Sequence, residues 1–145
     1  MWKEAVTAVW LTVLSMQDIK SKNVPVWMLW IGTVGATGAV LWECVSGTIN
    51  IMGLCKAIIP GVLLTVIAAA TGKAGCADGI ILMVLGLLTG YEGGLIAALC
   101  GLLLIALFSG SLLMFKRVKR DTRIPFVPFL TIGWLMAVCE KGGIF

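Results

Sequence analysis

The chain has 145 residues, of which 60% are apolar and 12% are charged, and its net charge is +4. Soluble domains carry about 25% charged residues, so this composition excludes a water-soluble globular protein. The length leaves no room for a second substantial domain. We therefore expect one all-α, polytopic membrane domain over residues 1–145, embedded in a lipid bilayer and without a nucleic-acid partner.

Apolar runs predict about six transmembrane helices, since a spanning helix needs about 20 mostly apolar residues. In chain order they cover residues Trp2–Gln17, Val26–Trp42, Gly53–Thr71, Asp78–Thr89, Leu95–Phe115 and Pro125–Cys139. The apolar stretch after Asp78 is too long for one helix, and Gly90, Gly93 and Gly94 predict a tight turn that divides it. Small residues that predict close packing against a neighbouring helix recur at Gly32, Gly35 and Gly38.

Basic residues are distributed unevenly between the two ends of the predicted bundle. With six spans, one end holds eight of them: Lys20, Lys22, Lys73, Lys116, Arg117, Lys119, Arg120 and Arg123. The other end holds three: Lys3, Lys56 and Lys141. Because cytoplasmic loops are enriched in Lys and Arg, we expect the first end to face the cytoplasm and both termini to be extracytoplasmic. Interfacial aromatic residues are expected near helix ends, at Trp2, Trp27, Trp42 and Trp134.

Two aspartates lie at the cytoplasmic ends of predicted helices, Asp18 after the first and Asp78 before the fourth. The predicted topology places both carboxyl groups on one side of the membrane at similar depth. The fourth helix is only about 18 Å long, against a hydrocarbon core of about 30 Å, which indicates that Asp78 is recessed or lines a wet cavity. The first helix is also short, so we expect it to continue past Asp18. Ionisable residues at such depth are candidates for function.

A close pair of carboxyl groups supports peptide hydrolysis. Two such groups share one proton, because they cannot easily ionise together. The ionised member takes a proton from the attacking water, and the protonated member donates to the peptide carbonyl oxygen. Simpler roles remain open at this stage: Asp78 as the N-cap of its helix, and Asp18 as an interfacial charge beside Lys20.

Two segments that contain these aspartates resemble the type IV prepilin peptidase family, which belongs to the GxGD group of membrane aspartic proteases. In QDIKSKNVPVWML, Asp18 matches the family's first catalytic aspartate, and Pro25 matches the proline of the following hydrophobic-proline step. In GKAGCADGIILM, the residues from Gly75 to Asp78 occupy the place of GxGD. Asp78 matches the second catalytic aspartate, and Ala77 replaces the second glycine of the motif.

A third segment, RIPFVPFLTIG, resembles the family's proline-containing start of the last helix through Pro125, Pro128 and Gly133. The three segments match in order and spacing across nearly the whole chain. One further departure is Gly79, followed by an isoleucine, where the family often has polar or basic residues.

The resemblance implies a membrane aspartic endopeptidase of the bacterial cytoplasmic (inner) membrane, with Asp18 and Asp78 catalytic and no metal or organic cofactor. The implied substrate is a prepilin or pseudopilin with a short basic leader, as in Tad or Flp pili or small secretion systems. Larger members carry paired cysteines that bind zinc and accompany N-methylation. Here a six-residue basic loop separates the first two helices, and the five cysteines form no Cys-x-x-Cys pair. The resemblance therefore implies a peptidase-only form.

Other interpretations predict different features. A non-enzymatic multi-pass protein, such as a transporter subunit or an assembly scaffold, would carry polar residues near helix midpoints, where this chain has mostly Leu, Ile, Val, Ala and Gly. A degenerate family member that binds prepilin without cutting it would not need both aspartates. Cys44 and Cys55 flank one polar loop and would pair only if that loop faces an oxidising compartment.

Overall fold

The computed structural model describes residues 2–21, 24–48, 50–71, 76–114 and 125–141, and the only regular secondary structure in this part of the chain is helix. Its helices are α1 (Trp2–Ser21), α2 (Val26–Val45), α3 (Ile51–Thr71), α4 (Cys76–Met114) and α5 (Val127–Lys141). Among them, α2, α3 and α4 are long and apolar enough to cross a membrane, and α5 is a shorter apolar helix. The predicted all-α class is confirmed.

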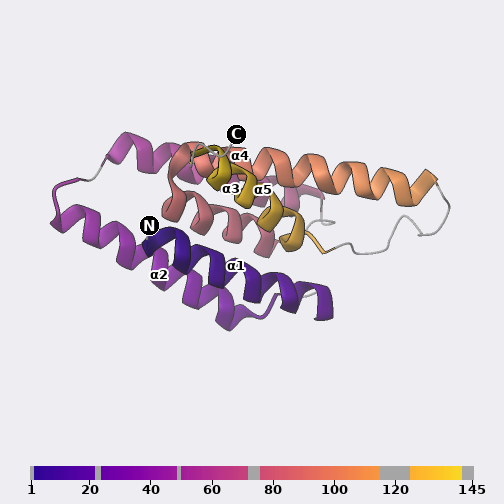
Figure 1. Ribbon diagram of the computed structural model, residues 1–145, viewed down its shortest axis with the longest axis horizontal. Coiled ribbons are helices and arrows are strands. Elements are labelled where there is room, and N and C mark those ends of the chain that lie inside the picture. Colours follow the sequence, from indigo (N-terminus) through magenta and orange to yellow (C-terminus); the bar gives the residue numbers. More distant parts are fainter. Residues whose placement is uncertain (1, 22–23, 49, 72–75, 115–124, 142–145) are drawn as a thin grey trace.

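The long helix α4 consists of two helical halves joined at Gly90, where φ is 82° and ψ is 171°. In a straight helix, Gly86 and Gly94 would lie about 12 Å apart. A Cβ atom built on Gly94 would instead lie 2.8 Å from the Cα atom of Gly86. The chain therefore reverses at Gly90, within the predicted turn, and Figure 1 shows the second half running back along the bundle. The positive φ at this turn suits glycine, which has no Cβ atom to clash.

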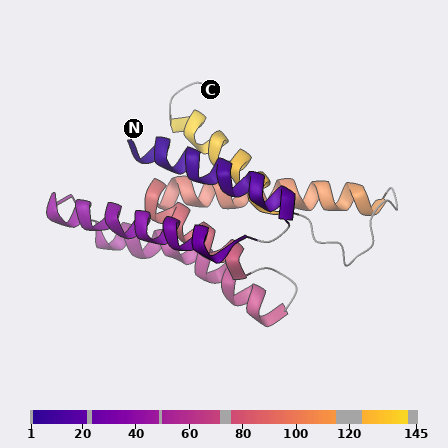
Figure 2. The same cartoon turned by 90° about the horizontal axis from the view of Figure 1, so that it is seen from below.

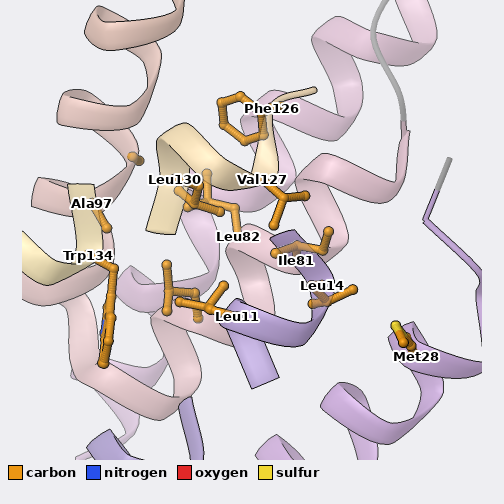
Figure 3. Close-up of a cluster of buried hydrophobic side chains, with 12 residues drawn as sticks. Leu11, Leu14, Met28, Ile81, Leu82, Ala97, Phe126, Val127, Leu130 and Trp134 are labelled. Carbon is orange, nitrogen blue, oxygen red and sulfur yellow. The ribbon is translucent and has the colours of Figure 1, made fainter. Parts of the chain in front are cut away.

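Helix α4 is the centre of the bundle, because it contacts each of the other four helices, whereas α3 contacts only α4 among the described helices. In Figure 2, α1 and α5 cross on one side of α4, and α2 and α3 lie on the other. Most of the buried apolar residues form one cluster between α1, α4 and α5, which Figure 3 shows. This cluster includes Leu11, Leu14, Ile81, Leu82, Leu85, Val127, Leu130 and Trp134.

The contact between α3 and α4 depends on glycine. A Cβ atom on Gly79 would lie 2.9 Å from the carbonyl oxygen of Gly61, and one on Gly86 would lie 2.2 Å from the carbonyl oxygen of Ala57. Such distances leave room only for hydrogen atoms, so the two backbones touch directly. Close approach through small residues is a usual way for helices to associate in lipid, because apolar side chains gain little by leaving lipid chains that are equally apolar.

The predicted glycine packing of α2 is only partly correct. Gly32 is covered by the ring of Trp10, which a Cβ atom there would overlap. Gly35 and Gly38 have no atom within 4 Å of such a Cβ, so they face outward. Ala36 is buried in their place. The face of α2 that meets α4 is therefore lined by different small residues from those expected.

The predicted interfacial position of Trp134 is wrong. Its side chain is only 3% exposed, and it lies in the middle of α5 as part of the core cluster. Trp27 and Trp42, by contrast, are exposed near the two ends of α2, as expected for interfacial residues. The side chain of Trp2 lies outside the described residues.

Several sequence predictions fall on parts of the chain that the structure does not describe. These residues are Gly75, Lys22, Lys73, Lys116, Arg117, Lys119, Arg120 and Arg123. Most of the predicted cytoplasmic charge, and the first residue of the GxGD-like motif, therefore lie outside the described residues. The two cysteines considered for a disulfide, Cys44 and Cys55, are both free and exposed.

Candidate functional site: a carboxyl pair where three helix ends meet

Asp18 lies in the last turn of α1, which continues to Ser21 as predicted. Its side chain is buried, with 6% of its surface exposed. The backbone N–H of Val127 donates a hydrogen bond to Asp18 Oδ2, with an N···O distance of 3.0 Å. The backbone N–H of Phe126 also interacts with this carboxyl group. Asp18 is therefore bound to the start of the last helix.

The start of α5 presents these amides because the first N–H groups of a helix have no acceptor within it. The carbonyl oxygen of Phe126 accepts hydrogen bonds from Phe129 and Leu130, both at 3.1 Å, so helical bonding begins there. Pro128 occupies the first turn, where the missing N–H of proline is no loss. The helix begins at Val127, two residues after the predicted Pro125.

Asp78 lies within the first turn of α4, which begins at Cys76. It is half-buried and interacts electrostatically with Asp18. The structure thus brings together the two aspartates that the sequence analysis selected. The simple N-cap role is wrong, because Asp78 is inside the helix rather than ahead of it. Ala77, which replaces a glycine of the family motif, is also helical, and alanine is the most favourable residue there.

An apolar layer lies directly beneath the two carboxyl groups. Leu14 is one helical turn before Asp18, and Ile81 is about one turn after Asp78. These side chains and Val127 are at most 1% exposed and lie side by side in the core cluster, as Figure 3 shows. The pair therefore lies above a layer of the core that has no polar side chain at Leu14, Ile81 or Val127. Electrostatic and hydrogen-bond interactions are stronger beside such a dry layer than in open water.

Gly79 fixes the position of Asp78 relative to α3. Its Cα atom packs against α3 so closely that an added Cβ atom would lie 2.0 Å from Thr65 Oγ1 and 2.9 Å from the Thr65 nitrogen. The Thr65 hydroxyl donates a hydrogen bond to the carbonyl oxygen of Gly61 at 2.8 Å. Gly79, which departs from the family pattern, is thus a packing residue, because a longer side chain there would separate α3 from α4.

A hollow lies at the other end of the first half of α4. It has a volume of about 310 Å³ and is lined by residues that include Asn50, Lys56, Tyr91 and Glu92. This hollow is open to the surface and contains neither aspartate, so we do not place the chemistry there. Among the described residues, no group of three Cys, Asp or Glu side chains is arranged to bind a metal ion.

Sequence reasoning missed the groups that hold the two aspartates in place. The backbone amides of Phe126 and Val127 have no side-chain signature, although Pro125 and Pro128 on either side indicated that a helix starts there. The role of Gly79 was also missed, because a glycine in a helix becomes informative only when its neighbour across the interface is known.

Comparisons with protein-family models, with curated proteins and with solved structures find no match to this chain.

Proposed function

We propose that this chain is a membrane aspartic endopeptidase of the type IV prepilin peptidase kind, in a peptidase-only form. Its substrate is a pilin or pseudopilin precursor, of the Tad or Flp type, from which it removes the short basic leader. Cleavage occurs at the cytoplasmic face of the bacterial inner membrane. Asp18 and Asp78 are the catalytic residues, and they act without a metal or organic cofactor.

The observation that carries this proposal is the position of Asp18 and Asp78 within electrostatic range of each other at the meeting point of α1, α4 and α5. The two residues are 60 positions apart in the chain, on different helices. Burial of two carboxyl groups next to each other is unfavourable for stability alone, so a pair of this kind is a candidate for acid–base chemistry. The three sequence segments that resemble the family supply the residues that form this meeting point.

A six-span topology with both termini outside the cytoplasm is consistent with the fold. The reversal at Gly90 divides the longest apolar helix into two, and α1 and α5 pack beside them. In Figure 1, the end of α1 and the starts of α4 and α5 lie toward the same end of the bundle. Lys20 is at this end as well. We therefore place the carboxyl pair near the cytoplasmic surface, where a substrate leader would arrive.

A transport function has less support from the structure. A transport path needs polar groups along the helix middles. Among the described residues, the buried polar or charged side chains are Thr7 and Asp18. The Thr7 hydroxyl donates to the carbonyl oxygen of Lys3 in its own helix, at 2.7 Å, so it is already satisfied. No polar path through the bundle follows from these two residues.

Co-expression with candidate prepilins tests the proposal. Wild type should convert the precursor to the mature form, whereas Asp18→Asn and Asp78→Asn should each abolish conversion, because asparagine cannot exchange a proton. Asp121→Asn is the matched control, since it removes the third aspartate of the chain, which lies in the basic segment after the fifth predicted span. It should leave cleavage unchanged.

Normal cleavage by either Asp18→Asn or Asp78→Asn would refute the catalytic pair and favour a non-enzymatic scaffold. All variants should be present in the membrane at wild-type amounts, as measured by immunoblotting. This check separates a loss of chemistry from a loss of protein.

A further inference from the structure

We propose that the start of α5 divides the roles of the two aspartates: its backbone amides hold Asp18 as the carboxylate that activates water, and Asp78 is the acid that protonates the peptide carbonyl. This inference rests on the proposed function, and it goes further by stating which of the two carboxyl groups carries the shared proton. It also makes the backbone N–H of Val127 a positioning group of the site.

The two carboxyl groups differ in their hydrogen-bond donors. Asp18 Oδ2 accepts the N–H of Val127 at 3.0 Å, and the N–H of Phe126 adds a second donor. A backbone N–H can only donate, so it stabilises a carboxylate and offers nothing to a carboxylic acid proton. The positive end of the α5 dipole acts in the same direction. Among the described residues, Asp78 has no corresponding hydrogen-bond donor.

No other described charge reverses this asymmetry. The nearest charged residue along α1 is Lys20, which is exposed. From α4 the group that faces Asp18 is Asp78 itself. The first described turn of α5 and the beginning of α2 contain no charged residue, and neither does the last turn of α3. Within the described residues, the donors at the start of α5 are therefore the polar groups that distinguish the two carboxyl groups.

The reaction then balances with no other reactant than water. The Asp18 carboxylate takes one proton from water while the water oxygen forms a bond to the peptide carbonyl carbon, and Asp78 gives its proton to the carbonyl oxygen. In the second step, Asp18 passes its new proton to the amide nitrogen as the C–N bond breaks. Asp78 takes back the hydroxyl proton as the new carboxyl group forms. Both residues end in their starting states.

Carbodiimide labelling tests the assignment without relying on activity, because carbodiimides react with protonated carboxyl groups. The purified protein is treated with dicyclohexylcarbodiimide, and modification of Asp18 and Asp78 is measured by peptide mass spectrometry. Wild type should be modified mainly at Asp78. Asp78→Asn should leave Asp18 weakly modified, because its amide donors remain.

Two substitutions at Val127 separate the hydrogen bond from access to the reagent. Val127→Pro removes the N–H at the first helical position, where proline is well tolerated. Val127→Ala also loses the packing of the valine side chain, but it keeps the N–H and is therefore the matched control. Val127→Pro should raise modification of Asp18 by about tenfold over Val127→Ala, which is the change expected for one charge-assisted hydrogen bond.

Preferential modification of Asp18 in wild type would overturn the assignment. Equal modification in the two Val127 variants, or strong modification of Asp18 in Asp78→Asn, would do the same. Failure of the proposed function looks different: the labelling pattern would be as expected, but no prepilin would be cleaved. The two ideas can therefore fail separately.

Discussion

Replacing Gly79 by alanine adds one methyl group at the closest contact between α3 and α4. The new carbon would lie 2.0 Å from Thr65 Oγ1 and 2.9 Å from both the Gly61 carbonyl oxygen and the Thr65 nitrogen. Rotation of Thr65 relieves the first contact only by breaking its hydrogen bond to Gly61. The two backbone contacts are relieved only if the helices move apart by a few tenths of an ångström.

The expected cost follows from these contacts. Overpacking of this kind costs about 1–3 kcal/mol, and the lost hydrogen bond costs about 1 kcal/mol. Alanine recovers about 1 kcal/mol through its higher helix propensity. Gly79→Ala should therefore lower the free energy of unfolding by about 1–3 kcal/mol. It should also slow prepilin cleavage, because Asp78 is the neighbouring residue and moves with the start of α4.

The change in stability is measured by heating the protein in detergent and determining, by size-exclusion chromatography, the fraction that remains folded at each temperature. Gly110→Ala is the matched control, because Gly110 is in the same helix and no atom lies within 4 Å of an added Cβ. The control should be neutral or slightly stabilised. If Gly79→Ala unfolds at the same temperature as Gly110→Ala, the close approach of α3 and α4 does not exist as described.

The remaining predictions concern the capping bond, an ion pair and the orientation. Asp18→Ala should be less stable than Asp18→Asn by about 1 kcal/mol in thermal unfolding, because both lose the charge but only asparagine keeps an acceptor for the α5 amides; equal stability would argue against the bond to Val127. Glu43→Gln breaks an ion pair between α1 and α2 that is partly exposed, and should cost less than about 1 kcal/mol in the same assay. Cys44 and Cys76 are both exposed, and they lie at opposite ends of the bundle. In intact spheroplasts that express single-cysteine variants, a membrane-impermeant maleimide should therefore label Cys44 but not Cys76. Labelling of Cys76 alone would invert the proposed orientation.

The helices were predictable from sequence, but the side of each helix that faces the core was not. Leu11 is fully buried and Val9 is 67% exposed, although both are aliphatic residues of α1. In a soluble helix a polar face would mark the outside. When the surroundings are lipid, outward and inward positions are equally apolar, so the pattern carries no such mark. This is why the outward position of Gly35 and the burial of Trp134 were missed.

The candidate site was predictable in its side chains and not in its backbone. Asp18 and Asp78 stood out because acidic residues at helix ends are rare in so apolar a chain. Their contact required knowledge of helix packing, which the predicted topology supplied only as a shared end of the bundle. The amide of Val127 contributes through its position rather than its residue type, so only a structure reveals it.

The bond between Asp18 and Val127 also has a consequence for biosynthesis, because it joins residues 109 positions apart. During translation α1 emerges first and α5 last, so both aspartates are synthesised well before the Val127 amide that bonds to Asp18. A nascent or truncated chain that ends before Phe126 has both carboxyl groups but lacks the backbone amides that bond to Asp18. For the membrane protease proposed above, this order would delay assembly of the site until almost the whole chain has left the ribosome.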